Sequence, residues 1–194
     1  MIMILTPETN VLNEEIYINE FMKTGDLLLH IRKNGMNDEE IRTYINKISH
    51  EFHKRLVLHS HFHLAQEMGI GRLHFKEIHR RQNLHKTYIN RYILSTSVHT
   101  VEDFNALGQC WNYAFVSPVF PSISKPGYGM GKNVLADLTN RNNPWVKLIG
   151  LGGIDALNCR SVYEAGADGI AILGAVWGNV APAKALHHIM YSLT

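Results

Sequence analysis

Short apolar runs alternate along the chain with segments whose apolar positions recur at helical spacing. Short apolar runs that are rich in residues favouring β-structure are typical of buried strands. They predict eight strands, at residues 1–6, 27–31, 56–58, 72–75, 92–97, 113–116, 146–151 and 169–173. Helical spacing predicts helices at 14–23, 100–107, 156–165 and 182–193. A further helix is predicted to begin at the capping box of Asn37 and Glu40, and a short one to end near Gly69.

This alternation favours a parallel sheet covered by helices. Apolar runs without strict polar–apolar alternation are typical of strands that are buried on both faces. Because eight strand–helix units make a (β/α)8 barrel, we expect an α/β TIM barrel, as one small domain over residues 1–194. A doubly wound open sheet with fewer strands is the alternative, since about 250 residues is the typical length of the barrel.

Composition narrows the classes of function. The 194 residues are 45% hydrophobic and 19% charged, which suits a globular core and excludes a disordered chain. A net charge of +2 argues against a nucleic-acid partner. Two cysteines without close spacing, Cys110 and Cys159, exclude a zinc finger and a disulfide framework. With no apolar run long enough to span a membrane, we expect a cytoplasmic protein that acts on small molecules. A homo-oligomer and a monomer are both compatible with the sequence.

Two glycine-rich segments follow the last two predicted strands. Gly152 and Gly153 end the seventh strand, and Gly174 and Ala175 end the eighth. Glycines at such positions let backbone N–H groups face an anion without a Cβ in the way. Because a phosphate site recurs after strands 7 and 8 of this fold, these four residues are predicted to bind phosphate. A tight turn without a ligand is the alternative.

Two further strand ends carry groups that suit anions. The loop after 113–116 is stiffened by prolines and places Ser122, Ser124 and Lys125 within four residues. Arg32 follows the second strand, where a guanidinium can bind phosphate through two parallel hydrogen bonds. His30 shares the strand face of Arg32, because side chains alternate with a period of two.

These motifs together resemble the thiamine-phosphate synthase and thiazole tautomerase family. The resemblance rests on His30-Ile-Arg32, Ser97-Val-His99, Ser-Pro-Val-Phe-Pro-Ser-Ile-Ser-Lys at 117–125, Gly-Gly-Ile at 152–154 and Gly-Ala-Asp-Gly-Ile-Ala at 166–171. It implies a (β/α)8 enzyme of thiamine biosynthesis, a transferase that couples an aminopyrimidine methyl diphosphate to a thiazole phosphate. In the implied mechanism pyrophosphate leaves first, and the thiazole nitrogen captures the resulting carbocation.

The resemblance also implies roles for individual residues. Lys125 and Arg32 would stabilise the departing pyrophosphate as catalytic groups. We expect a larger set of residues to bind substrate or phosphate: His30, Lys33, His59, Ser97, His99, Ser122, Ser124, Gly152, Gly153, Gly174 and Ala175.

Two positions depart from the family pattern in a way that affects metal binding. The family's Mg²⁺ ligands are aspartates, and this chain has Ser60 and His79 in their places. Mg²⁺ prefers carboxylate and water oxygens, so Mg²⁺ is a doubtful cofactor here. Two alternatives to a synthase therefore stay open: a thiazole tautomerase-like isomerase with His59, His74 or His79 as base, and a protein that binds thiazole phosphate or thiamine phosphate without turnover.

A separate hypothesis comes from His59, His61 and His63, which alternate after the third strand. On an extended strand these rings would share one face and could hold a transition metal, as in a metal-dependent hydrolase. A helical segment beginning near His61 would separate the rings instead.

Overall fold

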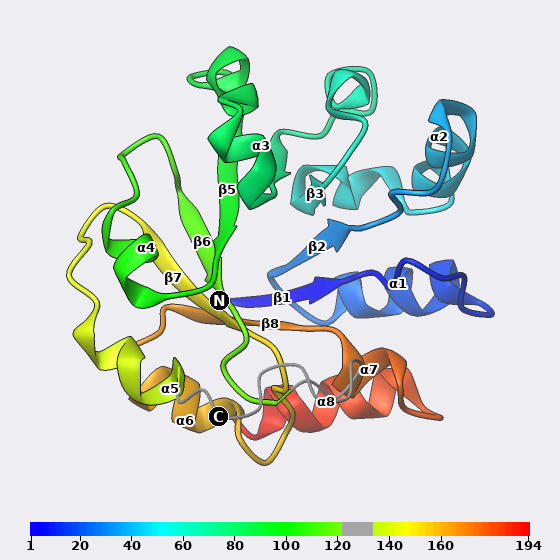
Figure 1. The fold of residues 1–194 in the computed structure, drawn as a ribbon. Helices are drawn as coiled ribbons and strands as arrows, with labels where there is room; N and C mark the ends of the chain where they lie inside the picture. Colours follow the sequence, from blue (N-terminus) through cyan, green and yellow to red (C-terminus); the bar gives the residue numbers. More distant parts are fainter. Residues whose placement is uncertain (122–133) are drawn as a thin grey trace.

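The eight predicted strands form a closed parallel barrel. In the computed structural model, which describes residues 1–121 and 134–194, each strand pairs with the next and β1 closes against β8 (Figure 1). The strands are β1 (Ile2–Leu5), β2 (Leu27–Ile31), β3 (Leu56–Leu58), β4 (Arg72–Phe75), β5 (Ile93–Val98), β6 (Tyr113–Val116), β7 (Lys147–Leu151) and β8 (Gly169–Ile172). The closure confirms the (β/α)8 prediction and excludes the open doubly wound sheet.

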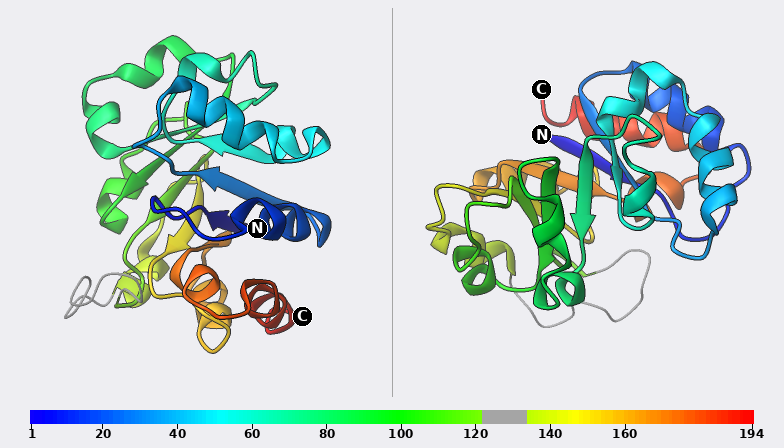
Figure 2. Two further views of the ribbon diagram at one scale, coloured as in Figure 1. Left: turned by 90° about the vertical axis from the view of Figure 1, so that its right-hand side faces the viewer. Right: turned by 90° about the horizontal axis from the view of Figure 1, so that it is seen from above.

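Helices surround the strands, as two further views show (Figure 2). The α-helices are α1 (Glu14–Lys23), α2 (Asp38–Asn46), α3 (Glu77–Arg81), α4 (Val101–Asn105), α5 (Val134–Asp137), α6 (Cys159–Glu164), α7 (Gly174–Trp177) and α8 (Pro182–Tyr191). The 3₁₀ helices are η1 (His50–Arg55), η2 (Phe62–Leu64), η3 (Leu84–Tyr88) and η4 (Leu138–Asn140). No helix in these described ranges is long and apolar enough to cross a membrane.

The predicted capping box sets the start of α2. The Asn37 side chain accepts hydrogen bonds from the backbone N–H groups of Glu39 and Glu40, each at 3.0 Å, and Glu40 Oε2 accepts the Asn37 N–H at 2.8 Å. These bonds satisfy N–H groups that have no partner inside the helix. The prediction of an α-helix just before Gly69 was wrong. That segment forms the short 3₁₀ helix η2 and no α-helix.

Side chains of the barrel strands divide into two layers by their alternation. One face of each strand joins the large core beneath the helices, which includes Leu29 and Phe75. The other face fills the barrel interior, where a smaller apolar cluster includes Met3, Val57 and Phe115. The interior is therefore packed, so binding chemistry is confined to one end of the barrel and to the polar groups just below it.

Candidate functional site at the carboxyl end of the barrel

The parallel, closed arrangement of the strands brings several predicted residues to one end of the molecule. Arg32 follows β2, Ser97 is the penultimate residue of β5, and Gly152 and Gly174 follow β7 and β8 closely. Because all eight strands run in the same direction, their carboxyl ends form a single rim. Residues separated by more than a hundred positions in sequence therefore border the same surface.

Arg32 is held in place by the loop after β1. Its backbone N–H donates to Thr6 Oγ1 at 2.7 Å, and its guanidinium contacts Glu8 Oε1 at 3.0 Å. Asn34 donates to the same carboxylate oxygen at 2.9 Å. The hydrogen bond from Arg32 is the largest cause that lowers the pKa of Glu8. The side chain of Arg32 keeps 22% of its surface exposed, so it is oriented and still accessible to an anion.

The glycines after β7 allow the loop from β6 to pack directly on them. Gly152 and Gly153 have φ values of 102° and 64°, a region in which other residues are strained. A Cβ on Gly153 would lie 2.6 Å from the Phe120 Cβ and would also collide with the Pro121 carbonyl oxygen. The two loops are thus in contact, with Val119 N–H donating to the Leu151 carbonyl at 2.9 Å.

The start of α7 supplies backbone donors after the neighbouring strand, β8. Gly174 and Ala175 are the first two residues of that helix, and the first N–H groups of a helix have no acceptor within it. Both residues retain partial exposure. Their amides are therefore available to a ligand at the rim.

His99 and Arg80 fix the end of β5. His99 Nδ1 donates to the Ser117 carbonyl at 2.9 Å, which ties β5 to the loop after β6. Arg80 on α3 donates to the carbonyl of Ser97 at 2.9 Å and to Thr96 Oγ1 at 3.3 Å. Arg80 has no sequence signal for this role, because its contact depends on how α3 packs against β5. Ser122, Ser124 and Lys125 lie outside the described residues.

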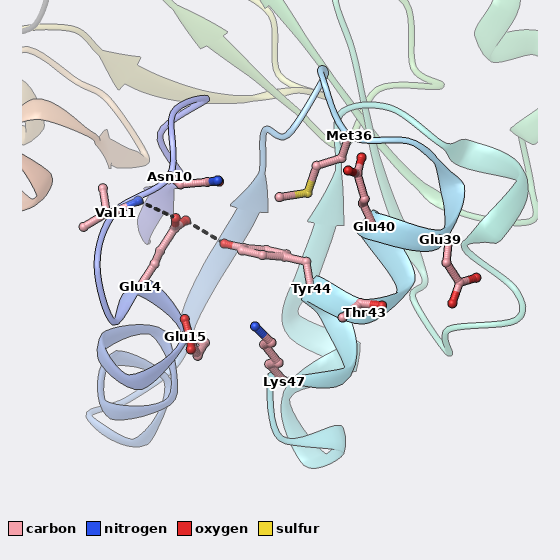
Figure 3. Close-up of a pocket in the computed structure, with 10 residues that line it drawn as sticks. All are labelled: Asn10, Val11, Glu14, Glu15, Met36, Glu39, Glu40, Thr43, Tyr44 and Lys47. Carbon is pink, nitrogen blue, oxygen red and sulfur yellow. Dashed lines mark hydrogen bonds between the residues drawn. The ribbon is translucent and has the colours of Figure 1, made fainter.

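Lys33, predicted to bind substrate, is engaged inside the protein. Its ammonium group is fully buried, 2.7 Å from Glu14 Oε2 and 3.1 Å from the Thr9 carbonyl oxygen. The other carboxylate oxygen of Glu14 accepts the Tyr44 hydroxyl at 2.6 Å, beside a cavity of about 400 Å³ between α1 and α2 (Figure 3). Burial is the main cause that raises the pKa of Tyr44, and the nearby Glu14 carboxylate is the second. The Tyr44 hydroxyl therefore stays neutral and donates a hydrogen bond. Lys33 thus joins the loop after β2 to α1 through Glu14, and its ammonium lies 5.3 Å from the centre of the Tyr44 ring on α2. It is not free to contact a phosphate.

The two positions that the resemblance assigns to Mg²⁺ do not suit that ion. The Ser60 hydroxyl is hydrogen-bonded to His61 Nδ1 at 2.8 Å. The His79 ring packs 5.9 Å from the Phe62 ring and 6.4 Å from the Phe75 ring, and burial lowers its pKa. Neither residue offers the carboxylate oxygen that Mg²⁺ prefers. The residues present do not fit the ion, and we assign no step to it.

The expected alternating face of His59, His61 and His63 is absent, because the chain turns at His61. That residue has φ 53° and precedes η2, so the segment is not an extended strand. His63 Nε2 lies 2.8 Å from Asp38 Oδ2 at the surface, and His61 Nε2 lies 3.8 Å from Oδ1. His59 instead enters the barrel.

The barrel interior just below the rim is polar where β2 to β6 face it. His30 and His59 are buried there with His74, and their nearest polar neighbours are Ser95, Ser97 and Tyr113. His30 is completely buried, so the predicted role in binding phosphate does not fit its position. Ser95 and Tyr113 belong to this group and were not among the predicted site residues. Ser95 and Ser97 are two positions apart on β5, and this spacing places both hydroxyls on the same face of the strand. It was the sequence signal from which Ser95 could have been predicted.

Comparison with known proteins places the chain in a family. The sequence profile described as thiamine monophosphate synthase matches residues 2–176. The thiamine-phosphate synthase of Lysinibacillus sphaericus is 22% identical over 179 residues, which cover 87% of this chain and 84% of that protein. The thiamine-phosphate synthase of Bacillus licheniformis is 25% identical over 176 residues, covering 87% and 79% of the two chains.

Solved structures share the fold at low identity. Thiamine phosphate pyrophosphorylase from Pyrococcus furiosus superposes with a TM-score of 0.80 and 17% identity, covering 99% of this chain and 94% of that one. The pyrophosphorylase from Bacteroides thetaiotaomicron gives a TM-score of 0.74 and 22% identity, covering 99% and 93%. Because the family profile spans almost all of a barrel whose rim carries the expected arginine and glycines, the chain belongs to the thiamine monophosphate synthase family.

Proposed function

We propose that this protein is a thiamine-phosphate-synthase-like transferase, which couples an aminopyrimidine methyl diphosphate to a thiazole phosphate. The observation that carries the proposal is the family match over residues 2–176, together with the common rim that Arg32, Gly152, Gly153 and Gly174 border. Anion-binding groups at separate strand ends of one rim suit two phosphorylated substrates that must meet. Holding two reactants in such proximity lowers the entropic part of the barrier.

The reaction proceeds by departure of pyrophosphate and capture of the cation. The C–O bond to the diphosphate breaks with its electron pair on the pyrophosphate, and the lone pair of the thiazole nitrogen forms the new C–N bond. Arg32 stabilises the charge that develops on the leaving group, and Lys125, Ser122 and Ser124 are proposed to act with it. Ser97 contributes a hydroxyl at the end of β5.

The thiazole phosphate is proposed to bind at the ends of β7 and β8. The backbone N–H groups of Gly152, Gly153, Gly174 and Ala175 would donate to its oxygens, as successive backbone amides do in other anion sites. His99 is proposed to orient the neighbouring loop through its bond to the Ser117 carbonyl.

The test is a coupling assay with both substrates, in which mass spectrometry follows product and pyrophosphate with and without added Mg²⁺. Arg32→Ala is expected to lower the rate by about 10- to 100-fold, because a hydrogen bond to a charged group contributes about 1.5–3 kcal/mol. The exposed Arg160→Ala on α6 is the matched control and should leave the rate unchanged. A rate in Arg32→Ala equal to that of the control would remove Arg32 from the mechanism.

Binding without turnover is the second candidate, favoured by the missing carboxylates at Ser60 and His79. Calorimetry with thiazole phosphate separates the two functions. Tight binding with the same affinity in the presence and absence of Mg²⁺, together with no coupled product, would support the function of binding without turnover. The isomerase alternative lacks such support, because burial weakens all three candidate bases. The pKa of His59 lies well below the usual range, that of His74 is about 3, and that of His79 is also lowered.

A further inference from the structure

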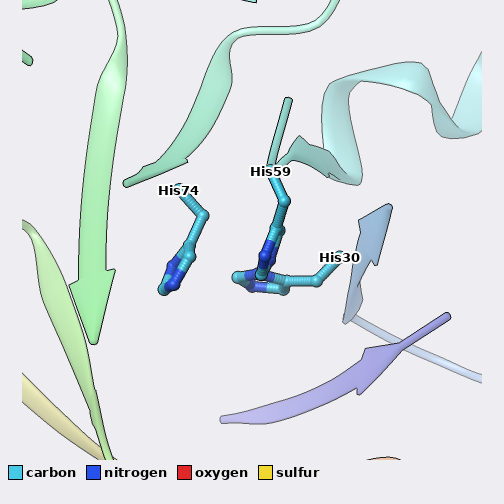
Figure 4. Close-up of side chains that lie close together, drawn as sticks. All are labelled: His30, His59 and His74. Carbon is cyan, nitrogen blue, oxygen red and sulfur yellow. The ribbon is translucent and has the colours of Figure 1, made fainter. Parts of the chain in front are cut away.

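Three imidazole rings from neighbouring strands meet inside the barrel. His30 lies on β2, His59 directly follows β3, and His74 lies on β4 (Figure 4). All three are almost completely buried, with at most 4% of their surface exposed. Buried polar rings in a barrel interior need partners, and here each ring is next to another ring.

The distances between the ring nitrogens are close to those of ligands on one metal ion. His30 Nδ1 and His59 Nε2 are 2.8 Å apart, and one nitrogen from each of the three rings lies within 4.8 Å of the others. Tetrahedral zinc with bonds of about 2.0–2.1 Å places its ligand atoms roughly 3.3 Å apart. The first pair would open by about half an ångström, and the third ring would approach by at most about 1.5 Å.

Hydrogen bonds identify which nitrogen of His74 carries a free lone pair. The Ser95 hydroxyl donates to the Leu73 carbonyl at 3.2 Å, so it accepts from His74 Nδ1–H at 2.9 Å. The opposite nitrogen, Nε2, therefore has its lone pair directed at the Ser97 hydroxyl, 2.9 Å away. A metal ion at Nε2 would take the place of that hydroxyl proton.

The other two rings have the same capacity. His59 Nε2–H donates to His30 Nδ1 across 2.8 Å. For an ion to bind both nitrogens, this proton would move to His59 Nδ1, which keeps both rings neutral. The Tyr113 oxygen is 3.1 Å from His30 Nε2 and can accept its N–H. Ser95 and Tyr113 would thus hold His74 and His30 in the tautomers that ligation requires, as outer partners do in metal sites. Burial lowers the pKa of all three rings, which leaves them neutral.

We propose that His30, His59 and His74 form a binding site for a divalent transition-metal ion of the zinc class. Three neutral imidazoles with no carboxylate among them select zinc, cobalt or nickel over Mg²⁺. Three protein ligands leave a fourth position on the ion for water or a substrate atom. The site lies just below the rim on the β2–β5 side. The proposal goes beyond the coupling activity and does not depend on it, since its test uses no thiamine precursor.

A second group of ligands on the surface must be distinguished from this site. His61, His63 and Asp38 lie together at the exposed end of η2 and α2. Because these residues are accessible, they could take up a metal ion without any help from the barrel. His63→Gln removes a ligand from the surface group and leaves the interior group intact, so it is the matched control.

The experiment titrates the metal-stripped protein with Co²⁺ and Zn²⁺ in the presence of excess Mg²⁺. We expect one equivalent of metal in the wild-type protein and in His63→Gln, with the visible absorption of four-coordinate Co²⁺. His30→Gln and His59→Gln should each weaken binding by at least about tenfold, and circular dichroism should verify that they are folded.

X-ray absorption on the zinc-loaded wild-type protein tests the proposal even where a variant fails to fold. Three imidazole nitrogens around zinc would support the interior site. The proposal is overturned if the wild-type protein binds no stoichiometric metal, if His63→Gln alone abolishes binding, or if a carboxylate oxygen from Asp38 appears among the ligands.

Discussion

Replacing Lys33 with methionine tests whether this buried lysine is structural. The substitution keeps a similar side-chain length and removes the ammonium group that faces Glu14 at 2.7 Å. The carboxylate of Glu14, with 4% of its side chain exposed, would then be buried without a counter-charge. Removing one partner of a buried ion pair costs about 3–5 kcal/mol. For a chain of this length, that loss lowers Tm by about 6–20 °C.

The assay is urea and thermal unfolding followed by circular dichroism, with two comparison variants. Arg42→Met breaks an exposed pair with Glu67, so it should cost less than about 1 kcal/mol. Lys33→Met combined with Glu14→Gln removes both charges and keeps a group that can accept the Tyr44 hydroxyl. The double variant should therefore be more stable than Lys33→Met alone.

The same variant separates a structural role from a role in binding phosphate. If Lys33 joins the loop after β2 to α1, stability falls while the affinity of the remaining folded protein for thiazole phosphate stays unchanged. If Lys33 contacts substrate, affinity falls and the free energy of unfolding changes no more than in Arg42→Met. The second result would refute our interpretation of this ion pair.

Three further predictions follow from local geometry. Gly153→Ala should cost at least about 1–2 kcal/mol in unfolding free energy, because alanine is strained at φ 64°, whereas the control Gly71→Ala has open space around it. Asn37→Ala should cost about 1 kcal/mol through loss of the α2 cap, measured by the same unfolding assay. The pKa of His74 is lowered from 6.5 to about 3 on folding, so the unfolded chain binds the extra proton and stability falls as the pH drops through this window. His74→Gln should reduce that slope by up to about 1.4 kcal/mol per pH unit; equal slopes would contradict the assignment.

The barrel was predictable from the sequence because its signals are local. Apolar runs fix the strands, and the Asn37 and Glu40 side chains fix the start of α2 through bonds within one turn. The placement of Arg32 and the glycines after β7 and β8 followed as well, since parallel strands in a closed barrel bring their carboxyl ends together. These predictions needed no knowledge of side-chain contacts.

The predictions that failed depend on contacts between distant segments. Lys33 and Glu14 are 19 positions apart, and no periodicity indicates that their side chains meet behind the loop after β1. The alternation of His59, His61 and His63 predicts a shared face only if the chain stays extended. A positive φ at His61 ends the strand geometry. Histidine adopts this conformation more often than most residues, but it remains uncommon, so the sequence alone does not predict the turn.

The two sides of the barrel interior carry different side chains, and this difference bears on where the chain departs from its family. Its β1, β7 and β8 side is lined by apolar residues such as Met3, Ile149 and Ala171, so binding there relies on backbone amides at the rim. The β2–β5 side instead contributes ionisable and hydroxyl side chains, among them His30 and His59. Substitutions that preserve the fold leave backbone donors in place but alter side-chain chemistry directly. A change in reaction or in metal preference within this family is therefore expected to arise on the β2–β5 side, while phosphate binding after β7 and β8 persists.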